Sequence, residues 1–248
     1  MLEVRDLRKY FGGIKAVNGC SFNVKKNAIT ALIGPNGAGK STIFNLISGI
    51  IKEDAGKIIF NGKDITHTSP EQISNLGISR LFQQTRLFGN LTVKENLLLA
   101  VNNEDTRFWK NLFSINKTTR EEEKIKEMLK LVEMEEFENK LARELSFGQK
   151  RLIELARTIL NPHSFLILDE PVAGISPKLR KKIAGILLNL KKSDATILLI
   201  EHDMNFTLSV SDSILVLEKG EVIARGTPEE IRNSPKVLEA YLGGQTKS

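Results

Sequence analysis

The sequence predicts an α/β fold built around a mostly parallel sheet, and two patterns indicate it. After residue 162, apolar strand patterns such as Phe165–Asp169 and Thr196–Ile200 alternate with helical ones. Earlier in the chain, an apolar run at residues 28–33 leads into a glycine-rich stretch, and a helix-like segment at 41–47 follows it. A strand, a glycine-rich turn and a helix in this order also belong to that kind of sheet.

The glycine-rich stretch, residues 34–41, has the spacing Gly-x4-Gly-Lys-Ser of a phosphate-binding loop. Glycines let the backbone turn tightly, so that successive N–H groups and the helix start face one anion. Lys40 adds a mobile positive charge for the outer phosphates, and the Ser41 hydroxyl is placed to ligate Mg2+. A glycine turn before an ordinary helix is disfavoured by the Lys-Ser pair and by both flanks. The pattern therefore predicts a nucleoside triphosphate site.

A second stretch, residues 145–150, reads Leu-Ser-Phe-Gly-Gln-Lys and opens a segment with apolar residues at helical spacing. Ser146 and Gln149 stand three apart, as in a capping box, so we expect a helix start with free N–H groups here. The buried-type strand that follows ends in Asp169 and Glu170. Triphosphate hydrolysis needs two such groups: one carboxylate for the metal and one that orients and polarises water.

The other elements follow in chain order. We expect antiparallel strands over residues 2–24, a hairpin strand at 57–60, a capped helix at Ser69, and a strand at 78–82. No strand pattern occurs between residues 84 and 162, where helices are expected from Thr92 and Thr118; residues 102–117 are the least predictable part. A hairpin at 213–224 and two short helices, from Thr227 and Ser234, complete the chain.

The composition fits a protein with a sizeable core. The chain has 248 residues, of which 41% are apolar and 27% are charged. No stretch approaches the roughly 18 apolar residues that span a bilayer, and the N-terminus lacks a signal-peptide pattern. The single Cys20 rules out an internal disulfide and fits a reducing compartment. The net charge of +6 comes from scattered lysines, so we expect no nucleic-acid partner.

These motifs, in this order, resemble the nucleotide-binding subunit of ATP-binding-cassette (ABC) transporters. The resemblance runs from about residue 2 to residue 243, and it includes Gln83 after a strand and His202 beyond the strand Thr196–Ile200. It implies one ABC ATPase domain over residues 1–248, with a P-loop NTPase core of mostly parallel strands. It also implies an N-terminal antiparallel β-subdomain and an α-helical subdomain at about residues 84–162.

The resemblance assigns roles to individual residues, with ATP and Mg2+ as cofactors. The nucleotide would be held by the loop residues Gly34, Pro35, Asn36, Gly37, Ala38, Gly39, Lys40, Ser41 and Thr42. Ser41 and Gln83 would ligate Mg2+, and Asp169 would hold it through water. Glu170 is the candidate general base, and His202 would contact the γ-phosphate. The aromatic residue that stacks on adenine would be Phe11, with Tyr10 as the competing candidate.

The resemblance also implies a head-to-tail dimer with a second ABC ATPase subunit, either a copy of this chain or a related cassette. Ser146, Gly148 and Gln149 would direct their helix N-terminus at the γ-phosphate held by that subunit. Two residues depart from the family pattern. Phe147 replaces a usual glycine and is expected to reduce backbone freedom, and Ser176 replaces a frequent aspartate and is expected to alter contacts across the interface.

Several segments resemble the ATPase of branched-chain amino-acid importers (the LivG type): residues 77–83, 86–88, 91–98, 171–174, 226–231 and 240–243. Relatives that serve urea or lipopolysaccharide export share much of this pattern, and a soluble ABC ATPase without transport is a further alternative. Apolar residues after Gln83 favour the importer, because an exposed apolar patch would dock transmembrane permease subunits. They are Leu87, Phe88, Leu91 and Val93. The expected location is cytoplasmic, peripheral on the inner face of the membrane.

Overall fold

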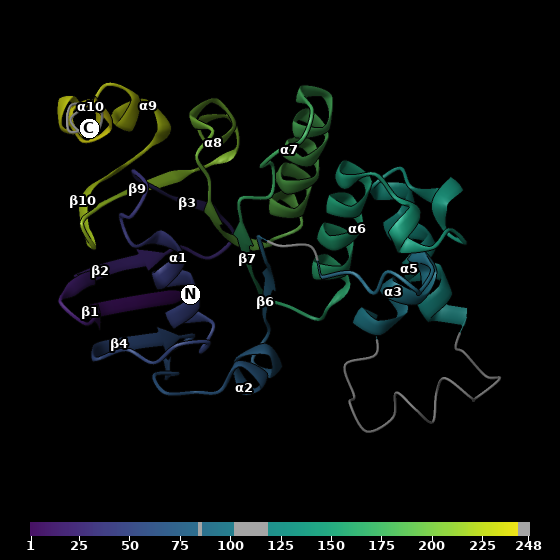
Figure 1. Ribbon diagram of the computed structural model, residues 1–248, viewed down its shortest axis with the longest axis horizontal. Helices are drawn as coiled ribbons and strands as arrows, with labels where there is room; N and C mark the ends of the chain where they lie inside the picture. Colours follow the sequence, from purple (N-terminus) through teal and green to yellow (C-terminus); the bar gives the residue numbers. More distant parts are fainter. Residues whose placement is uncertain (84–85, 102–118, 243–248) are drawn as a thin grey trace.

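The described part of the protein contains two β-sheets and a separate group of helices (Figure 1). The structure is a computed structural model, and it describes residues 1–83, 86–101 and 119–242. The segment expected to be least predictable, residues 102–117, lies outside these residues. No helix in the described part of the chain is both long enough and apolar enough to cross a membrane.

The N-terminal strands form a four-stranded antiparallel sheet in the order β2-β1-β4-β5. Its strands are β1 (Leu2–Phe11), β2 (Ile14–Val24), β4 (Ala55–Phe60) and β5 (Lys63–Asp64). Along β1, Leu2, Val4 and Leu7 are buried while the residues between them are more exposed, which is the alternation of a sheet with one covered face. The expected N-terminal strands and the hairpin strand before residue 61 are confirmed.

The second sheet has six strands in the order β10-β9-β3-β8-β7-β6, all parallel except β10. They are β3 (Ile29–Ile33), β6 (Ile78–Leu81), β7 (Phe165–Asp169), β8 (Thr196–Ile200), β9 (Ser213–Glu218) and β10 (Glu221–Gly226). Every residue of β3, β7 and β8 is buried, as expected for parallel strands covered on both faces. Because these three strands are neighbours and parallel, the segments that follow them meet at one edge of the sheet.

Helix α1 (Lys40–Ile47) packs between the two sheets. Its Ile43, Phe44 and Ile47 are fully buried and share one apolar cluster with residues of β1, β3 and β7. The other helices around the sheets are α2 (Pro70–Asn75), α7 (Pro177–Lys192), α8 (Met204–Val210), α9 (Pro228–Arg232) and α10 (Pro235–Leu242). Four of them begin at capping side chains, those of Ser69, Ser176, Asp203 and Thr227.

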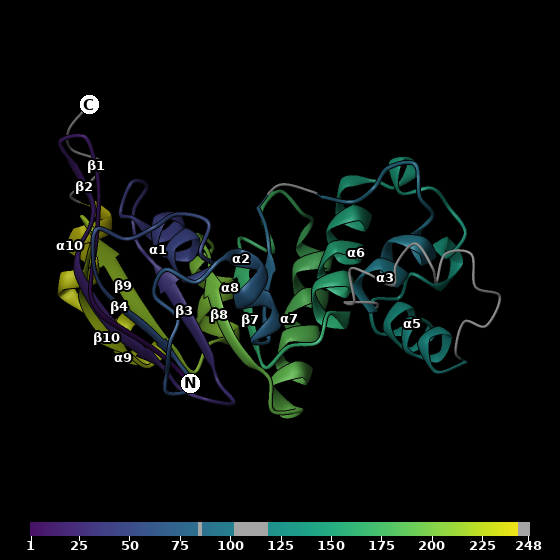
Figure 2. The ribbon, with the colours of Figure 1, turned by 90° about the horizontal axis from the view of Figure 1, so that it is seen from below.

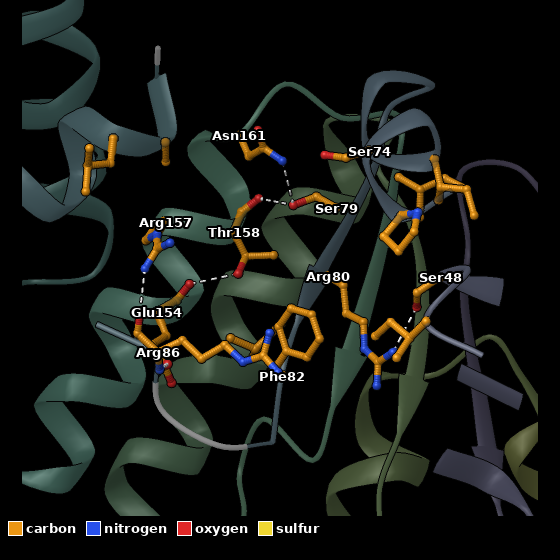
Figure 3. Close-up of a pocket in the computed structure, with 17 residues that line it drawn as sticks. Ser48, Ser74, Ser79, Arg80, Phe82, Arg86, Glu154, Arg157, Thr158 and Asn161 are labelled. Atoms are coloured by element: carbon orange, nitrogen blue, oxygen red, sulfur yellow. Dashed lines mark hydrogen bonds between the residues drawn. The ribbon is translucent and has the colours of Figure 1, made fainter. Parts of the chain in front are cut away.

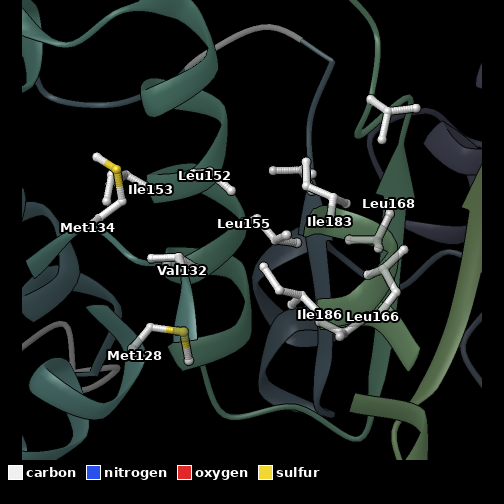
Figure 4. Close-up of a cluster of buried hydrophobic side chains, with 14 of the residues drawn as sticks. Met128, Val132, Met134, Leu152, Ile153, Leu155, Leu166, Leu168, Ile183 and Ile186 are labelled. Atoms are coloured by element: carbon white, nitrogen blue, oxygen red, sulfur yellow. The ribbon is translucent and has the colours of Figure 1, made fainter. Parts of the chain in front are cut away.

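A group of helices lies to one side of the sheets in both views (Figures 1 and 2). It contains α3 (Val93–Val101), α5 (Thr119–Leu131), α6 (Phe147–Leu160) and the short turns η1 (Glu135–Phe137) and η2 (Ala142–Glu144). Helix α6 joins this group to the core, because apolar side chains pack on both of its sides (Figure 4). Val132 and Met134 lie on one side, and Leu166 and Ile183 on the other. Among the described residues from 86 to 162 there is no strand, as expected.

Candidate nucleotide-binding and hydrolysis site

The phosphate loop joins β3 to α1, and its backbone path requires glycine at two positions. Gly34 has φ +154° and Gly39 has φ +100°. A Cβ atom would lie 2.1 Å from the Leu217 carbonyl oxygen at Gly34, and 2.2 Å from the Ala16 carbonyl oxygen at Gly39. Gly39 is also the N-cap of α1, so no side chain occupies the helix start. The N–H groups of the first turn are therefore open to an anion.

The Lys40 side chain lies inside this loop and is only 6% exposed. Its Nζ donates hydrogen bonds to the carbonyl oxygens of Gly34, at 2.8 Å, and Pro35, at 2.9 Å. Burial lowers the pKa of Lys40, and the negative charges of Glu170 and Asp169 oppose that shift. Ser41, the next residue of α1, is exposed at the helix start. A cation and a hydroxyl thus flank the same loop.

The structure brings the three predicted catalytic residues into contact. Glu170 follows β7 and has a left-handed backbone conformation, with φ +49°. Gln83 Nε2 donates a hydrogen bond to Glu170 Oε2 at 3.0 Å, and His202 Nε2 lies 2.5 Å from Glu170 Oε1. These residues come from the ends of β6, β7 and β8, so the parallel sheet assembles them across 119 residues of sequence, from 83 to 202.

Asp169 is the last residue of β7, and its two carboxylate oxygens have different surroundings. Oδ2 accepts a hydrogen bond from Arg80 Nη2 at 3.2 Å. Oδ1 is buried and has no hydrogen-bond partner among the residues that the structure describes. Burial raises the pKa of Asp169, and the charge of Arg80 opposes that shift. The hydroxyl of Ser41, the amide oxygen of Gln83 and this free carboxylate oxygen are the kind of hard ligands that Mg2+ prefers, so the residues present fit that ion.

Residues 145–150, called the signature from here on, form a capped helix start, as expected. Ser146 Oγ accepts a hydrogen bond from the Gln149 backbone N–H at 3.4 Å, and Gln149 Oε1 accepts one from the Ser146 N–H at 2.8 Å. With Gly148 they line a cavity of about 840 Å³ that also borders α7. Both views place α6 well away from α1 (Figures 1 and 2). The structure therefore does not bring Ser146, Gly148 and Gln149 to the phosphate loop of the same chain.

The two departures from the family pattern have simple structural roles. Phe147 is the first residue of α6, is 55% exposed, and lies with its ring against Gly174. Ser176 is the N-cap of α7, where its Oγ accepts a hydrogen bond from the Leu179 N–H and Pro177 follows as the first helical residue. Serine and aspartate are both good N-caps, so α7 can begin at Ser176 as it would at aspartate.

The predicted base-stacking residue, Phe11, ends β1 at the rim of the antiparallel sheet. Its side chain is 48% exposed, and Lys9 Nζ lies 5.5 Å from the centre of the ring. The competing Tyr10 is partly buried, and its backbone N–H donates a hydrogen bond to Asp54 at 2.6 Å. Phe11 therefore presents the more accessible ring face, which is the feature that stacking requires.

Sequence reasoning missed two buried charged residues that hold the loops of the site. Arg151 on α6 donates hydrogen bonds to the carbonyl oxygens of Asp169 and Glu170, both at 2.8 Å. Glu201 accepts the N–H groups of Val172, at 3.0 Å, and His202, at 3.1 Å. Burial raises the pKa of Glu201. The only signal in the sequence is a charged residue within an apolar pattern, which does not indicate its partner.

A cavity of about 360 Å³ lies between β6 and α6 (Figure 3). Arg80 and Ser48 lie on one wall, Glu154 and Arg157 lie on the other, and the Phe82 ring lies between them. The residues that line it are Ser48, Ile50, Pro70, Ile73, Ser74, Ile78, Ser79, Arg80, Leu81, Phe82, Arg86, Leu99, Ala100, Glu154, Arg157, Thr158 and Asn161. Segments on both sides of Gln83 thus border one concave surface.

The apolar patch expected after Gln83 needs a correction. Of its four residues, only Phe88 is largely exposed, at 53%. Val93 is fully buried, because it opens α3 and packs into the cluster shared with α6. Leu87 and Leu91 are partly buried, and the Asn96 amide ties the carbonyl oxygens of Phe88 and Leu91 to α3. The largely exposed apolar surface among these four residues is one aromatic ring rather than a patch.

Comparisons with known proteins identify the family of this chain. A family model described as ABC transporter matches residues 17–173, and one described as branched-chain amino acid ATP-binding cassette transporter matches residues 221–246. A curated relative from Archaeoglobus fulgidus, the probable branched-chain amino acid transport ATP-binding protein LivG, is 40% identical over 249 aligned positions. The alignment covers 99% of this chain and 96% of the relative.

Solved structures show the same fold. The ADP conformation of MJ1267, an ATP-binding cassette of an ABC transporter, has a TM-score of 0.86 at 35% identity, with 98% of each chain covered. A dimeric post-hydrolysis state of the ATP-binding cassette MJ0796, bound to ADP and Pi, has a TM-score of 0.79 at 25% identity. It covers 92% of this chain and 99% of that one. The chain therefore belongs to the ABC transporter family of ATP-binding proteins, and it binds and hydrolyses ATP.

Proposed function

We propose that this protein is the ATP-hydrolysing subunit of a membrane importer for branched-chain amino acids. The likeness to LivG extends over nearly the whole chain, which supports this assignment. The observation that carries the proposal is the separate match at residues 221–246, because that segment lies outside every nucleotide motif. Similarity there does not follow from ATP binding alone.

In this proposal the phosphate loop binds ATP, with its open N–H groups around the phosphates. Lys40 exchanges its two loop carbonyl partners for phosphate oxygens, which are charged and therefore form stronger hydrogen bonds. Ser41, Gln83 and, through water, Asp169 would hold Mg2+. When bound, this ion neutralises charge that develops on the phosphates. Gln83 uses its amide nitrogen on Glu170, so its amide oxygen is the atom that would serve as the ligand.

Glu170 acts as the general base for the attacking water. Its two oxygens contact Gln83 and His202 in the structure, so the side chain is already oriented by groups on both sides. His202 would leave Glu170 for the γ-phosphate, and that exchange frees Oε1 to accept a proton from water. Arg151 and Glu201 hold the surrounding backbone in place while these side chains change partners.

A second ABC ATPase subunit, identical or related, completes each site in a head-to-tail dimer. The separation of the signature helix from α1 within one chain supports this arrangement. The capped N-terminus of α6 offers free N–H groups that a phosphate on the other subunit would satisfy. The fold likeness to the dimeric MJ0796 cassette with ADP and Pi supports the same pairing.

The membrane permease subunits would dock at the cavity between β6 and α6, beside the exposed Phe88 ring. This surface borders Phe82 and Arg86, on either side of Gln83, so a docked segment would lie next to the hydrolysis site. Such an arrangement places the protein in the cytoplasm, peripheral on the inner face of the membrane.

Uptake by cells tests the proposed substrate. A strain that lacks this gene should lose high-affinity uptake of radiolabelled leucine, and the wild-type gene should restore it. A gene that carries Lys40→Ala should not restore leucine uptake, because the phosphate loop no longer functions. Urea uptake in the same strains is the matched control. Normal leucine uptake with lost urea uptake would reassign the substrate.

A further inference from the structure

Arg80 is a buried arginine on β6 that no nucleotide motif includes. Its side chain is 8% exposed, although it lies within a short strand whose other members are apolar or small. One face of its guanidinium lies near the Phe82 ring, with the carbon of the guanidinium 4.8 Å from the ring centre. A charge at such a position is costly unless each end of the group is paired.

The guanidinium makes hydrogen bonds in two directions. Nη1 donates to Asn45 Oδ1 and to Ser48 Oγ, both at 2.9 Å, and these residues lie on α1 and at its end. Nη2 donates to Asp169 Oδ2 at 3.2 Å, at the end of β7. Arg80 thus connects the helix that follows the phosphate loop to the carboxylate assigned to the metal.

We propose that Arg80 is a positioning residue that fixes the Asp169 carboxylate relative to α1 and leaves Oδ1 available to a metal-bound water. The inference rests on the proposed function, in which Asp169 holds Mg2+ through water. The two oxygens of Asp169 have different partners: Oδ2 accepts the hydrogen bond from Arg80, and Oδ1 is buried with no partner in the described part of the chain. Groups that orient a metal ligand commonly change metal affinity 10- to 100-fold when removed.

The planar fork of arginine explains why this residue type is needed. Two nitrogens on one rigid plane hold α1 and β7 at a fixed separation, and a lysine ammonium has no such fork. Lysine at this position could pair with Asp169 or with the α1 oxygens. Arg80→Lys should therefore keep the charge but lose part of the positioning.

Metal affinity can be measured without hydrolysis, with Mn2+ in place of Mg2+ and saturating ADP. The disappearance of the free Mn2+ signal in electron paramagnetic resonance gives the affinity. We expect Arg80→Met to weaken Mn2+ binding about 10-fold and Arg80→Lys to weaken it less. ADP affinity in EDTA should stay within about twofold of wild type. Arg157→Met is the matched control, because Arg157 lines the same cavity and donates its hydrogen bond to the Arg86 carbonyl oxygen instead of to Asp169.

A double substitution separates positioning from general structural damage. Arg80→Met should add little to the loss caused by Asp169→Asn, because both act on the same carboxylate. Independent losses that multiply in the double variant would overturn the proposal, as would unchanged or stronger Mn2+ binding in folded Arg80→Met. Should Arg80→Met not fold, Arg80→Lys with wild-type Mn2+ affinity would overturn it as well.

The same series distinguishes this inference from the function on which it rests. If Asp169→Asn weakens Mn2+ binding while both Arg80 variants do not, only the positioning role of Arg80 fails. If Asp169→Asn leaves Mn2+ binding unchanged, the metal assignment of Asp169 fails and the role of Arg80 fails with it.

Discussion

The phosphate-loop end of the core sheet and the signature end of α6 use their polar groups differently. At the first, functional side chains contact one another: Glu170 meets both Gln83 and His202, and Lys40 is folded into its own loop. At the second, Ser146 and Gln149 bond to each other's backbone and face a cavity. The first region already holds together the loop, the proposed base and the proposed metal ligands.

The difference teaches that, in the proposed head-to-tail dimer, one chain would supply two unlike halves of a site. The phosphate-loop half is assembled by parallel strands, so its residues are positioned by the buried core. The signature half is a capped helix N-terminus, whose free N–H groups can bind an anion. In a head-to-tail dimer each half finds its complement, and the variants below test the two halves separately.

The largest effect should come from Glu170→Gln in the phosphate-loop half. Glutamine keeps the size of the side chain but cannot accept the proton from water, so hydrolysis should slow about 10²- to 10⁴-fold. ATP binding should survive, because Lys40, Ser41 and Asp169 are unchanged. Steady-state phosphate release, measured beside equilibrium ATP binding, checks both statements.

The same variant tests the pairing of the two halves. With ATP retained, Glu170→Gln should accumulate as a dimer while the wild type stays mainly monomeric, which light scattering with ATP and Mg2+ would show. A protein that stays monomeric while hydrolysis is blocked would indicate that the physiological partner is a different cassette. Hydrolysis at the wild-type rate would end the general-base assignment.

For ATP binding, in contrast to the hydrolysis step, the largest effect should come from Lys40→Ala. A charge-assisted contact to phosphate contributes roughly 1.5–3 kcal/mol, so ATP affinity should fall about 10- to 150-fold. Turnover should become unmeasurable. Titration with a fluorescent ATP analogue checks the affinity, and unchanged binding would remove Lys40 from the site.

Gly148→Asp tests the signature half without touching the phosphate loop. The new carboxylate would repel a γ-phosphate arriving at the α6 N-terminus, and a charge there is worth up to ~2 kcal/mol, so hydrolysis should fall about tenfold. The helix should tolerate it, since a Cβ at Gly148 meets only the end of the Leu179 side chain. ATP binding to the monomer should not change.

Mixing the Lys40→Ala and Gly148→Asp variants then tests whether the phosphate loop and the signature of one site come from different chains. A dimer of Lys40→Ala with Gly148→Asp contains one intact phosphate loop opposite one intact signature. If the dimer is a homodimer and its two sites work independently, the mixture should hydrolyse ATP faster than either variant alone. A mixture that gains nothing would contradict that form of the dimer.

The sequence was sufficient wherever a short segment carries its own structural information. The phosphate loop, the capped α6 start and the buried strands follow from local spacing, and all appear in the structure. The sequence did not predict the contacts of Arg80 or Arg151, because the groups that these residues contact lie far away along the chain. Val93 shows a second limit, because the sequence does not distinguish an exposed from a buried apolar residue in a segment where a loop leads into a helix.

Phe88→Asp should have a smaller effect, confined to the membrane partner. Aspartate removes the exposed ring, and its charge would be buried when the permease docks, so co-purification with permease subunits should fall about fivefold, which corresponds to ~1 kcal/mol. ATP binding should stay normal. Leu238→Asp is the matched control, because Leu238 on α10 has the same 53% exposure. Equal assembly by both variants would place the docking surface elsewhere.

The smallest effect concerns His163, which lies in the segment between α6 and β7. Burial lowers the pKa of His163 from its usual value of 6.5, and its Nδ1 lies 2.7 Å from the Asn161 carbonyl oxygen. Near pH 6.5 the unfolded chain therefore binds a proton at His163, whereas the folded chain binds it only at lower pH. This contribution to stability is present above that pH and is lost as pH falls toward the folded-state pKa.

His163→Gln keeps a side-chain N–H donor for the Asn161 carbonyl and removes the titration. On acidification from about pH 7.5 to about pH 5.5, the melting temperature of the variant should drop less than that of the wild type. Parallel thermal melts without nucleotide measure the difference, and other titrating groups cancel because both proteins share them. An equal drop in melting temperature would mean that His163 has the same pKa in the folded and the unfolded chain. Its burial would then contribute nothing to the pH dependence of stability.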